Sequence, residues 1–347
     1  FRAWLQFELE RQLAAAAERG RAAGLAIGVY QDLAVGSASD SADTWMAQGL
    51  FARGATVGAP PDDYAPDGQN WGLPPLDPHR LRADGYRHWS RLLRAGFAHA
   101  GALRIDHAMG MMRLFWIPEG RPGSEGTYVH ARSDEMLGVL ALESRRAGAL
   151  VIAEDLGTVP PEFREELAEW AVLSSAVAYF ERDDGVFRPA AAYPPRALAT
   201  VQTHDLVPLA GHRDGADLRI RRSVGQIPDD AALAEALAER EREHAALLAR
   251  LREEGLLPAG AEPSPAELCV AVHAFLASTP SALVAASLDD LAGEAEPVNV
   301  PGVPVDRHRS WSRRMTVSLE ALRSDPLAAA VLAALRARHG GSRASGL

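Results

Sequence analysis

Three apolar stretches of this chain each end in acidic residues, and this repeated pattern limits the fold more than any other feature of the sequence. The stretches are LRIDHAMG (103–110), LVIAEDLG (150–157) and ATVQTHDL (199–206). Apolar and polar residues alternate in the first, and aliphatic or β-branched residues dominate the other two, so each predicts a strand. The acids that close these strands are Asp106, Glu154 and Asp205.

The spacing of the acids indicates repeated strand–helix units. Asp106 and Glu154 lie 48 residues apart, and Glu154 and Asp205 lie 51 residues apart. Each interval has room for a strand, a helix and two loops. In a (β/α)8 barrel the carboxyl ends of the strands meet at one face, where active sites are built. We therefore predict an α/β fold of the TIM-barrel type with the three acids at that face.

The remaining patterns predict an incomplete barrel with inserted helical subdomains over residues 1–340. About six of the eight strands are expected, at 24–33, 101–106, 149–155, 174–181, 197–205 and 281–289. Helices are expected at 1–20, 84–99, 141–148, 160–170, 229–255 and 265–277. Segment 229–255 is expected to form either one helix or a pair of helices. The first helix is expected to be amphipathic, with an apolar side formed by Trp4, Leu5, Phe7, Leu9 and Leu13.

Three further segments complete the predicted domain organisation. Segment 58–78 is dense in Pro, Gly and Asp and shows little periodicity, which is typical of a lid or binding loop. Within it, Tyr64 and Trp71 suit stacking on a sugar ring, and Gln69 suits hydroxyl recognition. A helical insertion is expected at about 213–260, and residues 341–347 read as a disordered tail.

The composition narrows the classes of partner. A formal net charge of −10 disfavours nucleic acid and anionic membrane surfaces as partners. One cysteine excludes an internal disulfide framework and a Cys-rich zinc site. The chain shows no signal-peptide pattern and no apolar run of spanning length, so we expect a cytoplasmic protein. It begins at Phe1 inside a helix, and we interpret it as a piece of something longer.

All 36 basic residues are arginine, because the sequence contains no lysine. This excludes Schiff-base chemistry, a P-loop lysine and a carbamylated-lysine metal bridge. Barrel hydrolases that use a metal ion usually supply a His-x-His pair and often a lysine, and neither occurs here. We expect neither a metal nor a cofactor, although a metal-dependent barrel hydrolase stays open as an alternative.

Paired carboxylates at strand ends suit glycoside chemistry, in which one acid attacks the sugar and the other protonates the leaving oxygen. Arg104 points to the same side of its strand as Asp106 and favours the negative carboxylate that an attacking group needs. Glu154, close to that charge, would be pushed toward its protonated form, as a general acid requires. Asp205 would bind sugar hydroxyls. The alternative for Arg104 and Asp106 is a structural ion pair at a sheet edge.

His107 and His204 each stand beside an acid at a strand end. Taken singly, either is best interpreted as a core imidazole with satisfied hydrogen bonds. Together they favour contacts to a polyhydroxylated ligand.

Five sequence blocks resemble those of the amylomaltases, bacterial 4-α-glucanotransferases that act on maltodextrins. The blocks are GLAIGVYQDLAVG, GAPPDDYAPDGQNWGLPPLDP, GALRIDHAMGMMRLFWIPEG, LVIAEDLGTVPPEFRE and TVQTHDL, and the similarity continues to about residue 325. The resemblance implies a (β/α)8 barrel with inserted subdomains and a retaining double displacement on α-1,4-glucans.

The resemblance also implies roles for individual residues. Asp106 matches the nucleophile, Glu154 the general acid/base and Asp205 the acid that stabilises the transition state. The residues that match substrate contacts are Arg104, His107, His204 and, less firmly, Asp32. Gln69 and Trp71 match the lid over the binding groove.

This chain departs from the family pattern near its C-terminal end and at its start. Asn299 and Trp311 are present, but Val303, Arg309 and Ser310 replace the usual residues of the motif, which affects one sugar contact. The resemblance implies that the first two barrel strands of the family lie outside this sequence, so a truncated barrel without catalysis is an alternative to the enzyme. The sequence leaves the chain-length preference and the oligomeric state open.

Overall fold

The computed structural model describes residues 1–61, 67–260, 262–303 and 305–337. The chain forms two compact units, Phe1–Ser175 and Ala176–Leu347, and each is described by itself. Tyr64 and the expected disordered tail at 341–347 lie outside the described residues.

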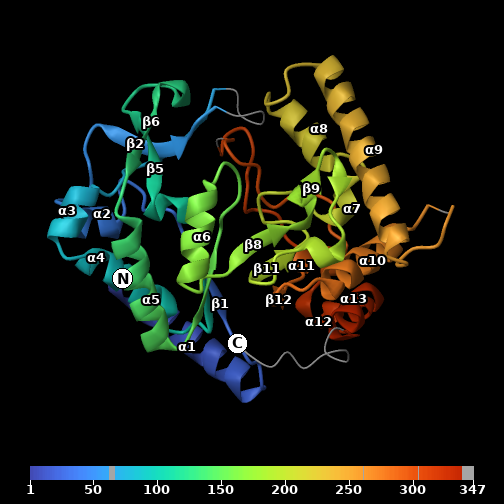
Figure 1. The fold of residues 1–347 in the computed structure, drawn as a ribbon, viewed down its shortest axis with the longest axis horizontal. Coiled ribbons are helices and arrows are strands. Elements are labelled where there is room, and N and C mark those ends of the chain that lie inside the picture. The colour runs from blue at the N-terminus through green and yellow to red at the C-terminus, as the bar shows by residue number, and fades with distance from the viewer. Residues whose placement is uncertain (62–66, 261, 304, 338–347) are drawn as a thin grey trace. The chain divides into compact units, whose positions relative to one another are not determined.

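A three-stranded parallel sheet positions the acids of the first unit (Figure 1). Its strands are β1 (Tyr30–Leu33), β4 (Ala102–Ile105) and β7 (Leu150–Ala153), in the order β1-β4-β7. Ile105 is paired with Leu33 on one side and with Ala153 on the other. Because parallel strands advance together, the residues that follow Ile105 and Ala153 leave the sheet at the same level.

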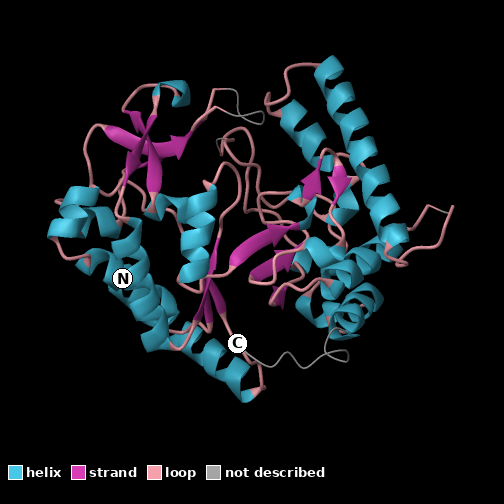
Figure 2. Ribbon diagram, in the orientation of Figure 1, coloured by secondary structure: helices cyan, strands magenta, loops and turns pink. Residues whose placement is uncertain are grey.

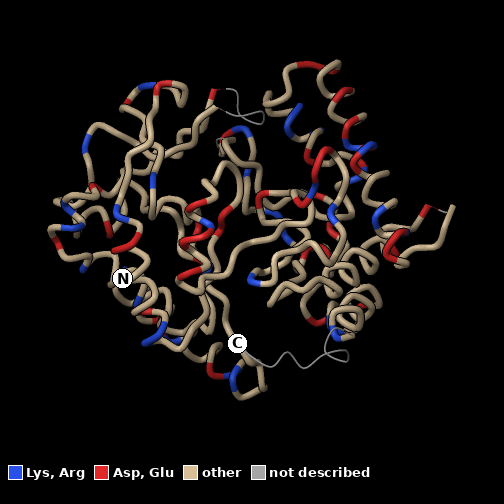
Figure 3. The backbone as a smooth tube through the Cα atoms, viewed as in Figure 1, with Lys and Arg blue, Asp and Glu red and all other residues tan. Residues whose placement is uncertain are grey.

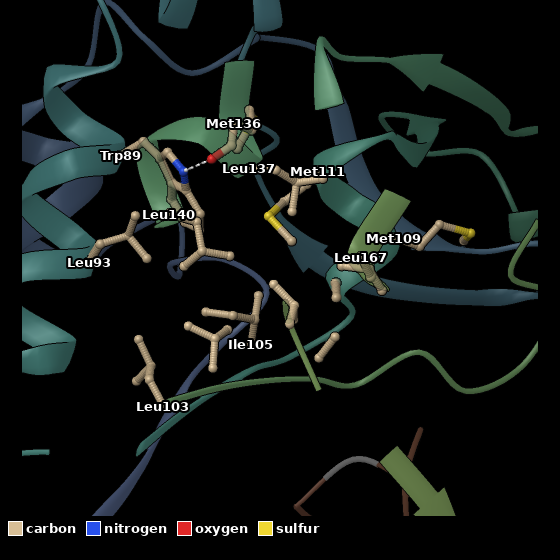
Figure 4. Packing of buried hydrophobic residues seen from close by; sticks show 14 of the residues in the cluster. Trp89, Leu93, Leu103, Ile105, Met109, Met111, Met136, Leu137, Leu140 and Leu167 are labelled. Atoms are coloured by element: carbon tan, nitrogen blue, oxygen red, sulfur yellow. Dashed lines mark hydrogen bonds between the residues drawn. The ribbon is translucent and has the colours of Figure 1, made fainter. Parts of the chain in front are cut away.

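Helices α4 (Arg87–Phe97) and α5 (Ser133–Ala147) pack against each other beside this sheet. Trp89, Leu93 and Phe97 recur every four residues on α4, and all three are buried, as expected for the core face of a helix. The Trp89 indole Nε1 donates a hydrogen bond to the Met136 carbonyl at 3.2 Å, which links the two helices inside the core (Figure 4). The other helical elements of the unit are α1 (Arg2–Ala22), α2 (Ala42–Met46), α3 (Pro78–Ala83), α6 (Pro161–Glu169), η1 (Ala108–Met111) and η2 (Gly123–Glu125).

A four-stranded antiparallel sheet, which the sequence did not predict, also belongs to the first unit (Figure 2). Its strands are β2 (Ala55–Ala59), β3 (Gln69–Leu73), β5 (Arg113–Pro118) and β6 (Thr127–His130), in the order β3-β2-β5-β6. Segment 58–78 is therefore not a plain loop, since β3 lies within it. Gly58 permits the pairing, because a Cβ at this position would stand 1.9 Å from the Gln69 carbonyl oxygen.

The prediction that α1 is amphipathic is wrong for the described part of the chain. Trp4 is 56% exposed and Phe7 is 61% exposed. Ala17 is the only buried residue of the helix. The helix forms because its alanines and long side chains have high helix propensity, and four of the five residues of the expected apolar side are exposed.

The second unit contains a short parallel sheet surrounded by helices. The strands β8 (Ser174–Val177), β11 (Ala197–Thr200) and β12 (Leu283–Val284) occur in the order β12-β11-β8, and β9 (Arg182–Asp183) pairs with β10 (Val186–Phe187). Its helices are α7 (Leu209–His212), α8 (Ala216–Ser223), α9 (Asp230–Glu253), α10 (Pro265–Ser278), α11 (Leu288–Ala292), α12 (Leu319–Leu322) and α13 (Pro326–Ala337), with η3 (Ala178–Phe180) and η4 (Ala190–Ala192).

The expected helix at 229–255 is one continuous helix, α9. The Asp229 carboxylate caps it by accepting a hydrogen bond from the Ala232 N–H at 2.8 Å. Leu247, Leu248 and Leu251 are buried along one face. Acidic and basic residues are interspersed along the helix (Figure 3), but not all of them face solvent, because the side chains of Arg240, Glu243 and Arg250 are only 11%, 19% and 15% exposed.

All six predicted strands contain an observed strand, but each observed strand is shorter than predicted. The parallel strands form two three-stranded sheets, and neither sheet closes on itself within the described residues. The fold is thus α/β, as predicted. No helix in the described ranges is both long enough and apolar enough to cross a membrane.

Glu143 on α5 makes a testable contribution to stability. It is 3% exposed and accepts hydrogen bonds from Arg94, Ser90 and Arg146. The bond from Arg94 is the main cause that lowers the pKa of Glu143 from 4.5 to about 2. A lowered pKa in the folded state stabilises the fold above the ordinary pKa, and this stabilisation is lost as the pH falls through the folded value.

We predict that Glu143→Gln lowers the free energy of unfolding by about 1–3 kcal/mol at pH 7. The difference from the unmodified chain should shrink between pH 4.5 and about 2, the interval between the two pKa values. Urea unfolding at a series of pH values measures both effects, with the exposed Glu165→Gln on α6 as a control. A destabilisation that is constant over this pH range would contradict the assignment.

Candidate active site

The parallel register brings two of the three predicted acids side by side. Asp106 directly follows β4 and Glu154 directly follows β7, one residue beyond the Ile105–Ala153 pair. The Glu154 N–H donates to the Ile105 carbonyl at 2.9 Å, and the Asp106 N–H donates to the Leu33 carbonyl at 3.0 Å. Sheet hydrogen bonding therefore continues through both acids and holds their backbones in place.

Arg104 joins the carboxylates of two strands. It contacts both Asp32 oxygens and the Asp106 Oδ1 atom, all at 2.8 Å. Asp32 and Arg104 are direct partners in the β1–β4 register, so their side chains emerge on the same face of the sheet. The Arg104 side chain is only 15% exposed. The structural ion pair and the site that we predicted are thus made by the same residues.

Glu154 has surroundings that favour a proton-carrying acid. Its Oε2 atom accepts from the His107 N–H at 2.9 Å, and its Oε1 atom accepts from the Leu156 N–H at 3.1 Å. Burial nevertheless raises the pKa of Glu154 above its ordinary value, and the negative charge of Asp106 acts in the same direction. The two N–H groups and Arg104 oppose this rise. A raised pKa is the property that a general acid needs.

His107 occupies a strained turn between the two acids. Its φ is +46°, in the left-handed region that residues other than glycine rarely adopt. This conformation aims its backbone N–H at Glu154. Burial lowers the pKa of its imidazole, so the ring is neutral at pH 7. The ring Nε2 atom is buried and has no hydrogen-bond partner in the described part of the chain.

Strand β3 places the two predicted lid residues beside this turn. Trp71 meets the His107 ring edge-on, with 5.2 Å between ring centroids. The Trp71 Nε1 donates to the Gln69 Oε1 at 3.2 Å. Asp32, Gln69, Trp71, Arg104, Asp106, His107 and Glu154 therefore form one group within the first unit.

The second unit holds the third acid in a group of its own. Asp205 lies beyond β11, and its Oδ1 accepts from the Asn299 amide at 2.6 Å. The His204 Nε2 stands 3.5 Å from the Asp205 Oδ2, and the His204 ring lies 5.2 Å from the Trp311 ring. The Ser310 hydroxyl, at a position that departs from the family pattern, accepts from the Val300 N–H at 3.1 Å and so supports the Asn299 segment.

Asp155 directly follows Glu154 in the chain, and the sequence predicted no role for it. It is 3% exposed, and its Oδ1 accepts from the Ser175 N–H at 2.9 Å. Its Oδ2 lies 3.3 Å from Arg164. Asp155 therefore stabilises the turn after β7, next to the candidate catalytic residue Glu154. In the sequence, only the apolar run that precedes Asp155 indicated that it is buried.

The geometry defines a class of protein: an α/β fold in which two acids end neighbouring parallel strands, one of them ion-paired and the other buried with a raised pKa. The described residues contain no group of three or more His, Cys, Asp or Glu side chains that could hold a metal ion. Residues 1–319 match the model of the 4-alpha-glucanotransferase family. The chain belongs to this family.

Similar proteins agree with this assignment. The 4-alpha-glucanotransferase of Mycobacterium tuberculosis is 41% identical over 97% of this chain and 48% of its own length. That of Haemophilus influenzae is 37% identical over 92% of this chain and 46% of its own length. The chain thus spans about half the length of the curated relatives it matches.

Solved structures show the same fold. The crystal structure of amylomaltase from Corynebacterium glutamicum matches with a TM-score of 0.91 and 38% identity, covering 96% of this chain and 49% of that one. Amylomaltase from Streptococcus agalactiae in complex with acarbose matches with a TM-score of 0.68 and 19% identity, covering 89% and 57%. The second match supports the fold alone.

We predict that Arg104→Gln raises the pKa of Glu154 further, because the positive charge of Arg104 lowers it. Carboxyl ¹³C NMR titration measures this pKa, with the Glu154 signal assigned by its loss in Glu154→Gln. The exposed Arg91→Gln on α4 is the matched control and should leave the titration unchanged. A fall in the Glu154 pKa on loss of Arg104 would contradict the described electrostatics.

Proposed function

We propose that this chain carries the catalytic acids of a 4-α-glucanotransferase that moves segments of α-1,4-glucan between maltodextrins by a retaining double displacement. The observation that carries the proposal is the Asp106–Glu154 pair. The two acids follow adjacent parallel strands, one is paired with an arginine, and burial raises the pKa of the other. Membership of the 4-alpha-glucanotransferase family supports the same reaction.

In the first displacement, an Asp106 carboxylate oxygen attacks the anomeric carbon of the donor. The glycosidic bond breaks as Glu154 gives its proton to the leaving 4-oxygen. Arg104 contacts the Asp106 carboxylate at 2.8 Å and orients it. The products are a shortened glucan and a glycosyl–Asp106 ester, with Glu154 now a carboxylate.

In the second displacement, Glu154 takes the proton of an acceptor's 4-hydroxyl while that oxygen attacks the anomeric carbon. The bond to Asp106 breaks, and both acids return to their starting states. We assign Asp205 to the sugar hydroxyls whose contacts strengthen in the oxocarbenium-like transition state. The residues assigned to substrate binding are Asp32, Arg104, His107, His204, Gln69 and Trp71.

We also infer that the two parallel sheets supply six strands of an eight-stranded (β/α)8 barrel, with the segment around β3 covering the groove. The TM-score of 0.91 to the Corynebacterium glutamicum amylomaltase supports this inference. Maltodextrin is the expected substrate, and the cytoplasmic location expected from the sequence stays a prediction.

Substitution of the two acids should separate their roles. Asp106→Asn keeps the size but removes the charge, so it should abolish the glycosyl-enzyme intermediate. Glu154→Gln should lose formation of the intermediate from maltodextrins but regain much of it with glycosyl fluorides, whose leaving group needs no proton, and the intermediate should then accumulate because the second displacement lacks its base. Intact-protein mass spectrometry detects the intermediate. An intermediate in Asp106→Asn, or equal losses with both substrates in Glu154→Gln, would refute the roles.

Product analysis should separate transfer from hydrolysis. Given maltotriose, the active protein should release glucose and longer maltodextrins with little gain in reducing ends, because transfer conserves glycosidic bonds. Trp71→Ala should raise the share of hydrolysis, since water then reaches the intermediate more easily. Trp45→Ala, an exposed tryptophan on α2, is the matched control. A steady rise in reducing ends without longer products would identify a hydrolase instead.

A further inference from the structure

A cavity of about 330 Å³ lies in the first unit behind the candidate active site. Leu33 and Ile105 line it, and their side chains alternate along the strands with those of Asp32 and Arg104. Alternate side chains of a strand point to opposite faces, so Leu33 and Ile105 face the cavity from the side of the sheet opposite to the Asp32–Arg104 pair. Arg104, Glu154, Gln69 and Trp71 are not among the residues that line the cavity.

The walls of the cavity are apolar and rich in aromatic rings and methionine. They include Phe51, Leu81, Trp89, Met111, Trp116 and Met136. Figure 4 shows Trp89, Met111 and Met136 in the core cluster beside it. The volume is at the lower end of the roughly 300–1,000 Å³ of small-molecule sites, which are likewise mainly apolar. Apolar cavities stay dry and take up small apolar rings.

A few polar groups converge on one part of this wall. The Asp43 carboxylate and the His88 imidazole both line the cavity, and the Ser37 hydroxyl donates to the Asp43 Oδ2 at 3.2 Å. Burial lowers the pKa of His88, although the nearby Asp43 charge opposes this. A carboxylate and a neutral imidazole both accept hydrogen bonds, so this part of the wall suits a ligand that donates one.

The inner end of the cavity is the turn that follows β4. Asp106, His107 and Gly110 all line it. His107 is the residue whose backbone is held at a φ of +46° and whose N–H orients Glu154. A ligand in the cavity therefore lies against the strained turn that includes Asp106 and whose His107 N–H orients Glu154.

We propose that this cavity is a binding site for a small apolar ring bearing one N–H donor, and that its occupancy changes the environment of the Asp106–His107 turn. Indole is the simplest molecule with this chemistry. The cavity shares the Asp106–His107 turn with the proposed glucan site but has apolar walls of its own, and its occupation needs no catalytic activity. Any effect of the ligand on transfer rests on the proposed function, whereas binding does not.

Isothermal titration with indole tests the site in the full chain. We expect saturable binding of one indole per chain. Ala34→Trp, an exposed position on the rim, should weaken binding at least tenfold, and Ala131→Leu should do the same by filling the cavity. Ala98→Trp, exposed and outside the lining, should leave affinity unchanged. Non-saturable binding, or full affinity in both lining variants, would overturn the proposal.

A ligand of the same shape that lacks the N–H group tests the inferred hydrogen bond. Benzofuran has the shape of indole but no N–H, so it should bind at least fivefold more weakly. Asp43→Ala should remove most of this preference, because it deletes the accepting carboxylate, whereas asparagine would still offer an accepting amide oxygen. Equal affinities for the two rings in the unmodified chain would overturn the inferred hydrogen bond.

Histidine ¹⁵N NMR tests the coupling to the turn without any activity assay. Indole should shift the His107 imidazole signals, assigned by their loss in His107→Gln. His204, which belongs to the second unit, provides the control signal. Bound indole with unchanged His107 signals would refute the coupling.

Discussion

The hydrogen bonds between β4 and β7 are the constraint on which the candidate site depends. Their parallel register sets Ile105 opposite Ala153, and this alone brings Asp106 and Glu154 to one level although 48 residues separate them. Arg104 then differentiates the two acids. It makes close ion pairs with Asp32 and Asp106, while Glu154 is held mainly by backbone N–H groups and is more strongly affected by burial. Two chemically similar side chains thereby have different surroundings, one paired with a guanidinium and the other buried with a raised pKa.

The turn at His107 links this electrostatic arrangement to the packing below it. Its left-handed backbone is costly for a residue with a side chain, and it persists because the surrounding structure holds it. Trp71 packs against the ring on one side, and Ala108 and Met109, buried in the core, follow directly in the chain. The site is thus supported by the antiparallel sheet and by the α4–α5 core together, and not by the parallel strands alone.

The sequence predicted what depends on local periodicity and could not predict what depends on distant pairing. The alternation in LRIDH and the apolar run before Glu154 located β4, β7 and the acids that follow them. Strand β3 was missed because Gln69, Asn70 and Gly72 have low strand propensity, and its pairing depends on the close approach at Gly58. The burial of Asp155 was equally hidden, since its partners Arg164 and Ser175 are 9 and 20 residues away. The prediction of an apolar side for α1 was wrong because periodicity places residues on one face of a helix but does not say whether another element covers that face.

The orientation of Glu154 depends on atoms that every amino acid shares. Both of its carboxylate oxygens are held by main-chain N–H groups, those of His107 and Leu156. Side chains at these two positions can change through evolution or design without removing either donor, proline excepted. The orientation of the Glu154 carboxylate is therefore set by the path of the backbone. Substitutions around Glu154 can change its pKa while leaving this orientation unchanged.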